Sequence, residues 1–270
     1  MSDSTFCSVL PGCPASCFAM NRAAVMMAEL SGGVLLPGEL RIEPAQLQLA
    51  VPQLSHLKAL PTEVQLLNKA ASACNVDATC TSGRDDQMRA VASMEYVKGG
   101  NAYVCTGTLM NNARQDGTPY FLSANHCIDS QTVASTLETY WNFRSSKCNA
   151  STVASNVQAV TGGAQLLYTT TATDTTLLRL NGTPPTNAVF AGWNGSTAGA
   201  IDASIYSIHH PAGDLQKFSQ GQIYGYRNCT INSSTGAVTC SSSTVSAGAF
   251  YGVTWTRGMT EGGSSGGALF

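Results

Sequence analysis

Between positions 100 and 270 the apolar residues come in short runs, and no run continues with the period of a long helix. The runs are rich in β-branched and aromatic residues, and clusters of Gly, Asn and Ser separate them. Four clear examples lie at 103–109, 118–123, 175–180 and 204–208. Many short strands with frequent turns are typical of a barrel or a sandwich. The sequence therefore predicts an all-β fold for this part of the chain.

The first 69 residues differ from the rest in composition and in the pattern of their apolar residues. A Leu- and Pro-rich stretch predicts one strand over 47–51, and the residues after Pro61 predict a short helix over 62–67. The β pattern begins near position 70. The Gly- and Pro-containing segment at 181–185 is the clearest candidate for a linker between two β halves.

The charge balance argues against several functions. Charged residues make up 11% of the 270 residues, the formal net charge is −2, and no basic stripe is visible, so nucleic-acid binding is not expected. No apolar run is long enough to predict a membrane span. An export signal is not convincing either, because Asn21, Arg22 and Glu29 interrupt the apolar stretch at 18–30. We therefore expect that Met1 is not the original start, or that an export signal has been lost.

The ten cysteines favour disulfides over a metal site. Their number is even, no Cys-x-x-Cys motif is present, and the chain has only four histidines, so zinc is the weaker interpretation. Disulfides imply an oxidising compartment, which predicts a secreted protein, extracellular or periplasmic. Spacing alone does not give the connectivity. Cys229 and Cys240 are expected to pair because they lie close together in the sequence.

The segment Gly263-Ser264-Ser265-Gly266-Gly267 is the strongest candidate for chemistry. Glycines on both sides of Ser265 allow a sharp turn whose N–H groups can meet an oxyanion. The alternative is a flexible Gly/Ser linker. The segment also matches the Gly-x-Ser-x-Gly elbow of α/β-hydrolases, whose acid and histidine follow the serine. Only five residues follow Ser265, and none is acidic or His, so we exclude the elbow.

A base and an acid for Ser265 must then lie upstream. An apolar strand leads into His126, and the adjacent Cys127 can hold that turn through a disulfide. Asp174 directly precedes an apolar strand and would lie where that strand begins. The alternative for His126 is an ordinary core or surface histidine, and the alternative for Asp174 is an aspartate that caps a strand. The order His126, Asp174, Ser265 is that of the chymotrypsin-like class.

Several short blocks share their order and spacing with one family. From about Cys74 to Phe270 the chain resembles the bacterial lysyl endopeptidases and their secreted trypsin-like relatives. The blocks that carry the resemblance lie at 73–77, 89–91, 105–112, 120–127, 140–142, 174–180, 191–193, 208–211 and 260–267. The resemblance implies a chymotrypsin-like double β-barrel with the catalytic cleft between the barrels. The expected units are a pro-segment-like region at 1–69, a first barrel at 70–183 with His126 and Asp174, and a second barrel at 184–270 with Ser265.

The same resemblance implies the residue roles. His126 is the base, Asp174 orients it, and Ser265 is the nucleophile. The backbone N–H groups of Gly263 and Ser265 form the oxyanion hole. Neither cofactor nor metal is expected, the substrates are polypeptides, and a monomer is expected.

Two disulfides also follow from the resemblance. Cys105 and Cys127 match one pair of the family, and Cys80 and Cys148 match a second. Cys74 matches a cysteine whose partner in the family lies beyond position 270. The pairing of the N-terminal cysteines stays open: Cys7, Cys13 and Cys17.

The adjacent His209 and His210 suggest a metal, but no third ligand accompanies them at a suitable spacing. The family has the same Ile-His-His-Pro stretch, so a structural or cleft-lining role is favoured. Trp193 is likewise expected to be a packed residue near the cleft.

The chain departs from the family at its end. Phe270 comes just after the nucleophile turn, where the family continues with further strands, a helix and most of the pocket for the substrate side chain. We expect an incomplete second barrel with open edges, and a chain that folds poorly and cleaves little. Trypsin has a pocket acid six residues before the serine, where this chain has Met259. Lysine preference is thus implied by the family alone, and Glu261 is expected to shape the turn.

Two positions bear on activation. Cleavage after Lys69 would be a natural self-processing step for a lysine-specific enzyme, although Lys69 can equally be a surface lysine. Many animal relatives have, before the nucleophile, an Asp that pairs with a freed N-terminal amine. Ser264 stands at that position and has no charge. We therefore expect that a new N-terminus does not switch the site on electrostatically.

These observations predict a secreted trypsin-like serine endopeptidase that hydrolyses peptide bonds through an acyl-enzyme, with possible cleavage after lysine. The alternative is a truncated, inactive relative that acts as a binding or decoy module.

Overall fold

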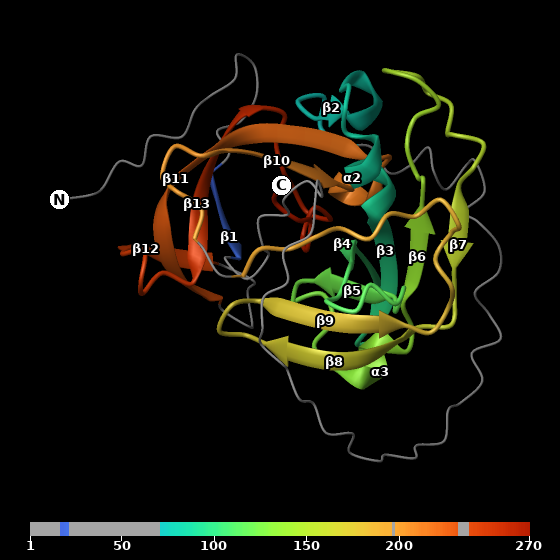
Figure 1. The fold of residues 1–270 in the computed structure, drawn as a ribbon, viewed down its shortest axis with the longest axis horizontal. Helices are drawn as coiled ribbons and strands as arrows, with labels where there is room; N and C mark the ends of the chain where they lie inside the picture. Colours follow the sequence, from blue (N-terminus) through green and yellow to red (C-terminus); the bar gives the residue numbers. More distant parts are fainter. Residues whose placement is uncertain (1–16, 22–70, 196–197, 232–237) are drawn as a thin grey trace.

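The computed structural model describes residues 17–21, 71–195, 198–231 and 238–270. Its main elements are two antiparallel β-sheets that lie side by side, and the helices are short (Figure 1). This confirms the all-β expectation. The strand and the helix expected at 47–51 and 62–67 lie outside the described residues.

The first sheet has seven strands in the order β7-β6-β3-β4-β5-β9-β8. Every neighbouring pair is antiparallel. The strands are β3 (Val91–Lys98), β4 (Asn101–Met110), β5 (Tyr120–Ser123), β6 (Glu138–Trp141), β7 (Gln158–Val160), β8 (Ala164–Thr170) and β9 (Thr175–Leu180). Two short helices accompany it: α2 (Asp85–Ala90) and α3 (Gln131–Ala134).

The second sheet is built around the long strand β11 (Lys217–Ile231). This strand pairs with β2, β10, β12 and β13, and β13 also pairs with β1. The bounds are β1 (Cys17–Asn21), β2 (Val76–Asp77), β10 (Ser204–His209), β12 (Val238–Ser243) and β13 (Phe250–Arg257). Two strands that precede the first sheet in sequence therefore belong to the second sheet. The stretch between β9 and β10 contains the expected linker and carries the chain from one sheet to the other.

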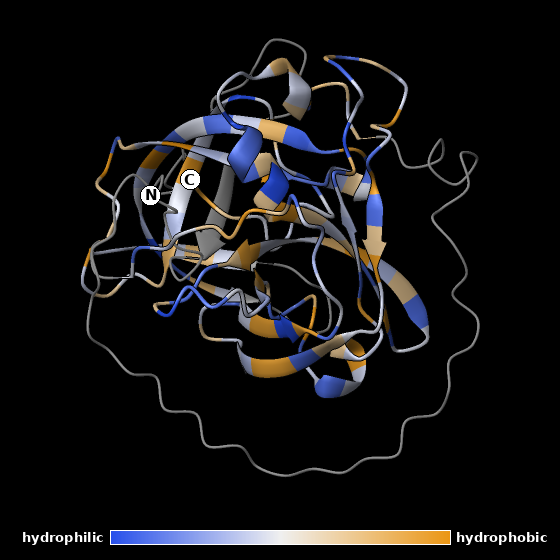
Figure 2. Cartoon of the chain, turned by 45° about the vertical axis from the view of Figure 1, so that its right-hand side comes forward, coloured by the Kyte–Doolittle hydropathy of each residue, from blue (hydrophilic) through white to orange (hydrophobic). Residues whose placement is uncertain are grey.

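The core explains why these segments form strands. Hydrophobic and hydrophilic bands alternate along several ribbons (Figure 2), so one face of each strand can be buried. In the first sheet the rings of Phe121 and Trp141 are fully buried, with centroids 5.9 Å apart. A separate buried cluster mixes residues of both sheets, including Val91, Ile208 and Phe218. Apolar packing therefore joins the two sheets as well as filling each one.

Gly107 lies in β4 directly under the Phe121 ring. A Cβ at this position would lie 2.2 Å from Phe121 Cε1 and 3.0 Å from Met94 Sδ. We expect Gly107→Ala to lower the free energy of unfolding by about 1–3 kcal/mol through overpacking. Gly225→Ala in β11 is the matched control, because a Cβ there meets nothing within 4 Å. Urea unfolding midpoints measure both, and equal losses in the two variants would contradict this packing.

Candidate active site

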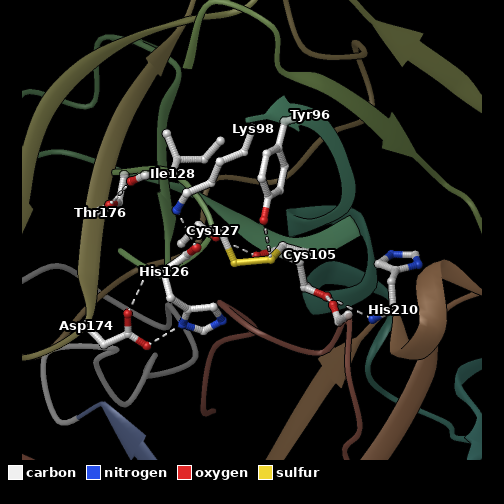
Figure 3. Close-up of a disulfide and its surroundings, with 12 residues drawn as sticks. Tyr96, Lys98, Cys105, His126, Cys127, Ile128, Asp174, Thr176 and His210 are labelled. Carbon is white, nitrogen blue, oxygen red and sulfur yellow. Dashed lines mark hydrogen bonds and ion pairs between the residues drawn. A yellow bond between two sulfur atoms is a disulfide. The ribbon is translucent and has the colours of Figure 1, made fainter. Parts of the chain in front are cut away.

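The pairing of β5 with β9 brings His126 and Asp174 together. The two strands are antiparallel, and Ser123 at the end of β5 lies opposite Thr176 near the start of β9. His126 follows β5 by three residues, and Asp174 directly precedes β9. Both residues therefore leave the sheet at the same end, and their side chains face each other (Figure 3).

The Asp174 carboxylate makes two hydrogen bonds to His126. Its Oδ2 lies 2.7 Å from the ring Nδ1, and its Oδ1 accepts the backbone N–H of His126 at 2.8 Å. Asp174 has a φ of 49°, a left-handed conformation that Asp tolerates better than most residues. Because the carboxylate accepts at Nδ1, that nitrogen carries the proton and Nε2 keeps its lone pair. This is the tautomer that a general base for a serine needs.

The side chains of Asp174 and His126 differ in their exposure to solvent. The Asp174 side chain is 15% exposed, whereas the His126 side chain is 45% exposed. The acid is thus largely covered by protein, and the imidazole can be reached from solvent.

Neighbouring groups hold the backbone of the His126 turn. Lys98 Nζ donates to the His126 carbonyl at 3.0 Å and pairs with Asp129 at 2.7 Å. Thr176 donates its hydroxyl to the Ile128 carbonyl at 2.6 Å. These contacts come from two different strands and surround the turn (Figure 3).

A disulfide joins Cys127, next to His126, to Cys105 on β4. It closes a sequence separation of 22 residues, which corresponds to about 3 kcal/mol on the loop-entropy account. The one group of possible metal ligands among the described residues is Cys105, His126 and Cys127. Because the two sulfurs are bonded to each other, they are not free to hold a metal.

The structure contains the other two expected cysteine pairs. Cys80 is bonded to Cys148, and Cys229 is bonded to Cys240 at facing positions of β11 and β12. Cys74 is disulfide-bonded as well, whereas the family resemblance places its partner beyond Phe270.

The turn around Ser265 is packed tightly against both sheets. Gly263 and Gly266 have φ values of 93° and 83°, which glycine adopts readily. A Cβ on Gly263 would lie 2.8 Å from the His210 carbonyl oxygen, and one on Gly266 would lie 2.3 Å from the Thr106 carbonyl oxygen. The flexible-linker alternative is therefore wrong for this segment.

Two backbone donors in this turn have no acceptor in the described part of the chain: the N–H groups of Gly263 and Ser265. An oxyanion hole needs such donors, free of protein acceptors. No hydrogen bond joins the Ser265 hydroxyl to His126 among the described residues. Such bonds are often long without substrate and tighten in the complex.

Thr106 connects the turn to the first sheet, a role that the sequence analysis missed. Its backbone N–H donates to the Ser265 carbonyl and its hydroxyl donates to the Gly263 carbonyl, each at 2.8 Å. The same hydroxyl accepts the His210 N–H at 3.0 Å. Thr106 follows Cys105, so one short stretch of β4 contacts both the His126 turn and the Ser265 turn. The sequence offered one indication of this role, because Thr106 directly follows Cys105, a cysteine of the expected disulfide beside His126.

His209 and His210 are fully buried. Burial lowers the pKa of His209 to about 3 and that of His210 to about 4. His210 Nδ1 lies 3.0 Å from the Asp214 carbonyl oxygen, and the ring stacks on Phe143. Neither histidine belongs to a group of possible metal ligands in the described residues.

Trp193 differs from the expectation of a packed side chain. It is 54% exposed, and its indole N–H donates to the Asn111 carbonyl at 3.2 Å. This single bond holds the indole nitrogen and leaves much of the ring in solvent.

An all-β chain with a His–Asp pair on one sheet and a glycine-flanked serine held between the sheets has the organisation of the trypsin-like serine peptidases. The comparison with protein families agrees: residues 68–270 match the family described as lysyl endopeptidase, C-terminal domain. The chain belongs to the lysyl endopeptidase family.

Individual relatives give the extent of the likeness. The lysyl endopeptidase of Pseudomonas aeruginosa is 36% identical over 247 residues, which cover 87% of this chain and 50% of that protein. The chain thus spans about half the length of this relative. A stretch of 35 residues, 13% of the chain, is 69% identical to 4% of the phenylalanine–tRNA ligase beta subunit of Oleidesulfovibrio alaskensis.

Solved structures are more distant. The active form of the Rv3671c protease from M. tuberculosis has a TM-score of 0.46 and 13% identity, over 74% of this chain and 76% of that one. Deg5 has a TM-score of 0.41 and 11% identity, over 69% and 76%.

The two buried histidines make stability depend on pH. An unfolded histidine has a pKa near 6.5, so between that pH and about 4 the unfolded chain binds protons that the native imidazoles do not. The free energy of unfolding therefore falls as the pH falls through this range.

We expect His210→Asn, which keeps a donor near Nδ1, to reduce this dependence by about one proton, or about 1.4 kcal/mol per pH unit once the unfolded histidine is protonated. Urea unfolding at pH 7, 6 and 5 measures it. An unchanged slope would show that His210 is protonated in the native state.

Proposed function

We propose that this chain is a secreted serine endopeptidase that hydrolyses peptide bonds through an acyl-enzyme. Ser265 is the nucleophile, His126 the base and Asp174 the residue that orients the base. The observation that carries the proposal is the pair of hydrogen bonds from His126 to the Asp174 carboxylate. These bonds leave Nε2 of an exposed imidazole free to accept a proton. Family membership adds independent support.

The reaction has two halves. Ser265 Oγ attacks the peptide carbonyl carbon while His126 Nε2 takes the hydroxyl proton. The oxyanion that forms accepts hydrogen bonds from the Gly263 and Ser265 N–H groups, which the described residues leave without an acceptor. The C–N bond then breaks as His126 returns the proton to the leaving amine. In the second half, water attacks the carbonyl carbon of the acyl-enzyme while His126 takes its proton. The ester bond to Ser265 then breaks, His126 returns the proton to Ser265 Oγ, and the carboxylic acid product leaves.

We propose cleavage after lysine. The support is the name of the relative from Pseudomonas aeruginosa, lysyl endopeptidase. Met259, at the position of the trypsin pocket acid, is buried, and its carbonyl accepts the Ser219 hydroxyl. The Glu261 carboxylate instead accepts the Ser72 N–H at 2.8 Å and the Asn75 side-chain amide at 2.6 Å. Glu261 is therefore assigned to holding residues 72–75 beside the nucleophile turn.

Secretion and processing complete the proposal. Three disulfides between described cysteines suit an oxidising compartment. Ala71, the second residue after the expected cleavage at Lys69, donates its N–H to Asp214 at 3.0 Å. Residues 1–69 are proposed as a removable pro-segment, so processing would also remove β1, which pairs with β13. The two barrels are proposed at 70–183 and 184–270, and β2 joins the sheet of the second barrel by pairing with β11. Polypeptides are the proposed substrates. In the described part of the chain, no helix has the length and apolar character of a membrane span.

Replacing Asp174 tests the proposed roles. Asp174→Asn removes the charge and the acceptor that hold His126, so we expect kcat on a lysyl peptide substrate to fall about 10⁴-fold with the fold retained. Asp202→Asn is the matched control, because Asp202 also has a left-handed φ, of 66°, and its side chain is exposed.

Full activity in Asp174→Asn would contradict the role of Asp174. A wild-type chain that folds, binds the peptide and does not cleave it would favour a non-catalytic binding module instead.

A further inference from the structure

The nucleophile turn contacts a buried histidine that the proposed mechanism does not use. His209 is the last residue of β10 and is fully buried. Its Nδ1 lies 2.8 Å from the hydroxyl oxygen of Ser264, the residue before the nucleophile. Its Nε2 lies 3.0 Å from the hydroxyl oxygen of Ser219 on β11. The imidazole thus bridges the nucleophile turn and the second sheet.

The surrounding bonds determine where the protons lie. The Ser219 hydroxyl donates to the Met259 carbonyl at 2.8 Å, so its oxygen accepts the proton of His209 Nε2. Nδ1 of the neutral ring is then an acceptor and takes the hydroxyl proton of Ser264. The Ser264 oxygen in turn accepts the Glu261 N–H at 3.1 Å. Each donor in this series of four hydrogen bonds, from the Glu261 N–H to the Ser219 hydroxyl, therefore has one acceptor.

The neutral ring is the form that this arrangement needs. A protonated imidazole would put a second donor, Nδ1–H, against the Ser264 hydroxyl. Burial keeps the pKa of His209 far below its usual value, and the neighbouring His210 and Lys217 lower it further. His209 therefore stays an acceptor throughout the neutral pH range.

Ser264 lies between the two proposed oxyanion donors, Gly263 and Ser265. The Ser265 N–H belongs to the peptide unit that contains the Ser264 carbonyl, and that carbonyl accepts the Gly267 N–H at 3.0 Å. The Ser264 N–H donates to the Glu261 carbonyl at 2.9 Å. The side-chain bond to His209 adds a contact from outside the turn, so it restricts the rotation of Ser264 and of the peptide plane that carries the Ser265 N–H. The Gly263 N–H belongs to the peptide unit of residues 262–263, one unit before the plane that ends at the Ser264 nitrogen.

We propose that His209 is a positioning residue that holds the oxyanion hole through the Ser264 hydroxyl, without a charged partner. This inference rests on the proposed function of the Ser265 site. A buried neutral hydrogen bond replaces an ion pair to a chain terminus, so the turn is formed before any processing of residues 1–69. Pro-segment removal then acts by opening access to the site.

A double-mutant cycle tests the proposal. We expect Ser264→Ala and His209→Phe each to lower kcat on a lysyl peptide about 10- to 100-fold, since the loss of a whole oxyanion donor costs about 10²–10³. KM should stay within about twofold. The double variant should be no slower than the slower single variant, because both remove the same bond. Ser264→Thr keeps the hydroxyl and should recover most of the rate.

Ser207→Ala on β10 is the matched control and should leave kcat unchanged. Ser207 is also buried, and its hydroxyl has no partner among the described residues. A peptide boronate, which mimics the oxyanion, should lose affinity in Ser264→Ala by the same factor as kcat/KM. Additive losses in the cycle, or losses in stability with kcat unchanged, would overturn the proposal.

An amide-exchange measurement separates this inference from the proposed function. If the wild-type chain has no activity, the proposed function fails. The His209–Ser264 bond is then tested by hydrogen exchange at the Ser264 and Gly267 amides, which are hydrogen-bonded within the turn and should exchange faster in Ser264→Ala than in wild type. Unchanged exchange would overturn the positioning role whether or not the chain is active.

Discussion

The two hydrogen bonds between Asp174 and His126 are the contact on which the proposed chemistry depends. They exist because β5 and β9 pair in antiparallel fashion, which places His126, three residues after β5, beside Asp174, the residue directly before β9. The carboxylate sets the tautomer of the imidazole and also holds its backbone. The disulfide at Cys127 and the bond from Lys98 then hold the same turn from β4 and β3. The site is thus supported by the first sheet on several sides.

The nucleophile turn is held from two directions. Thr106 contacts it from the first sheet through its N–H and its hydroxyl, and His209 contacts it from the second sheet through Ser264. The buried cluster that mixes residues of both sheets keeps these two supports in place. Small shifts between the sheets would therefore change the distance between Ser265 and His126, which is the distance that catalysis depends on.

Much of the fold and of the site could be predicted from the sequence. The run at 175–180 coincides with β9, and the run at 103–109 lies within β4, because β-branched residues flanked by turn formers leave few alternatives. His126 and Asp174 stood out because His126 follows one apolar strand and Asp174 directly precedes another. Thr106 did not, since its bond to Gly263 spans 157 positions of the sequence and depends on how two sheets pack. The bond from His209 to Ser264 was missed for the same reason, and the identity of Ser264 indicated only that an ion pair is absent.

The proposed catalysis requires that Ser265 is a nucleophile activated by His126. Labelling with a fluorophosphonate, followed by mass spectrometry of the digested chain, tests it most directly, because phosphonylation requires a working base and oxyanion hole. We expect one labelled residue, Ser265, and very slow labelling in Asp174→Asn. A label on Ser264, or a folded wild-type chain that takes up no label, would contradict it.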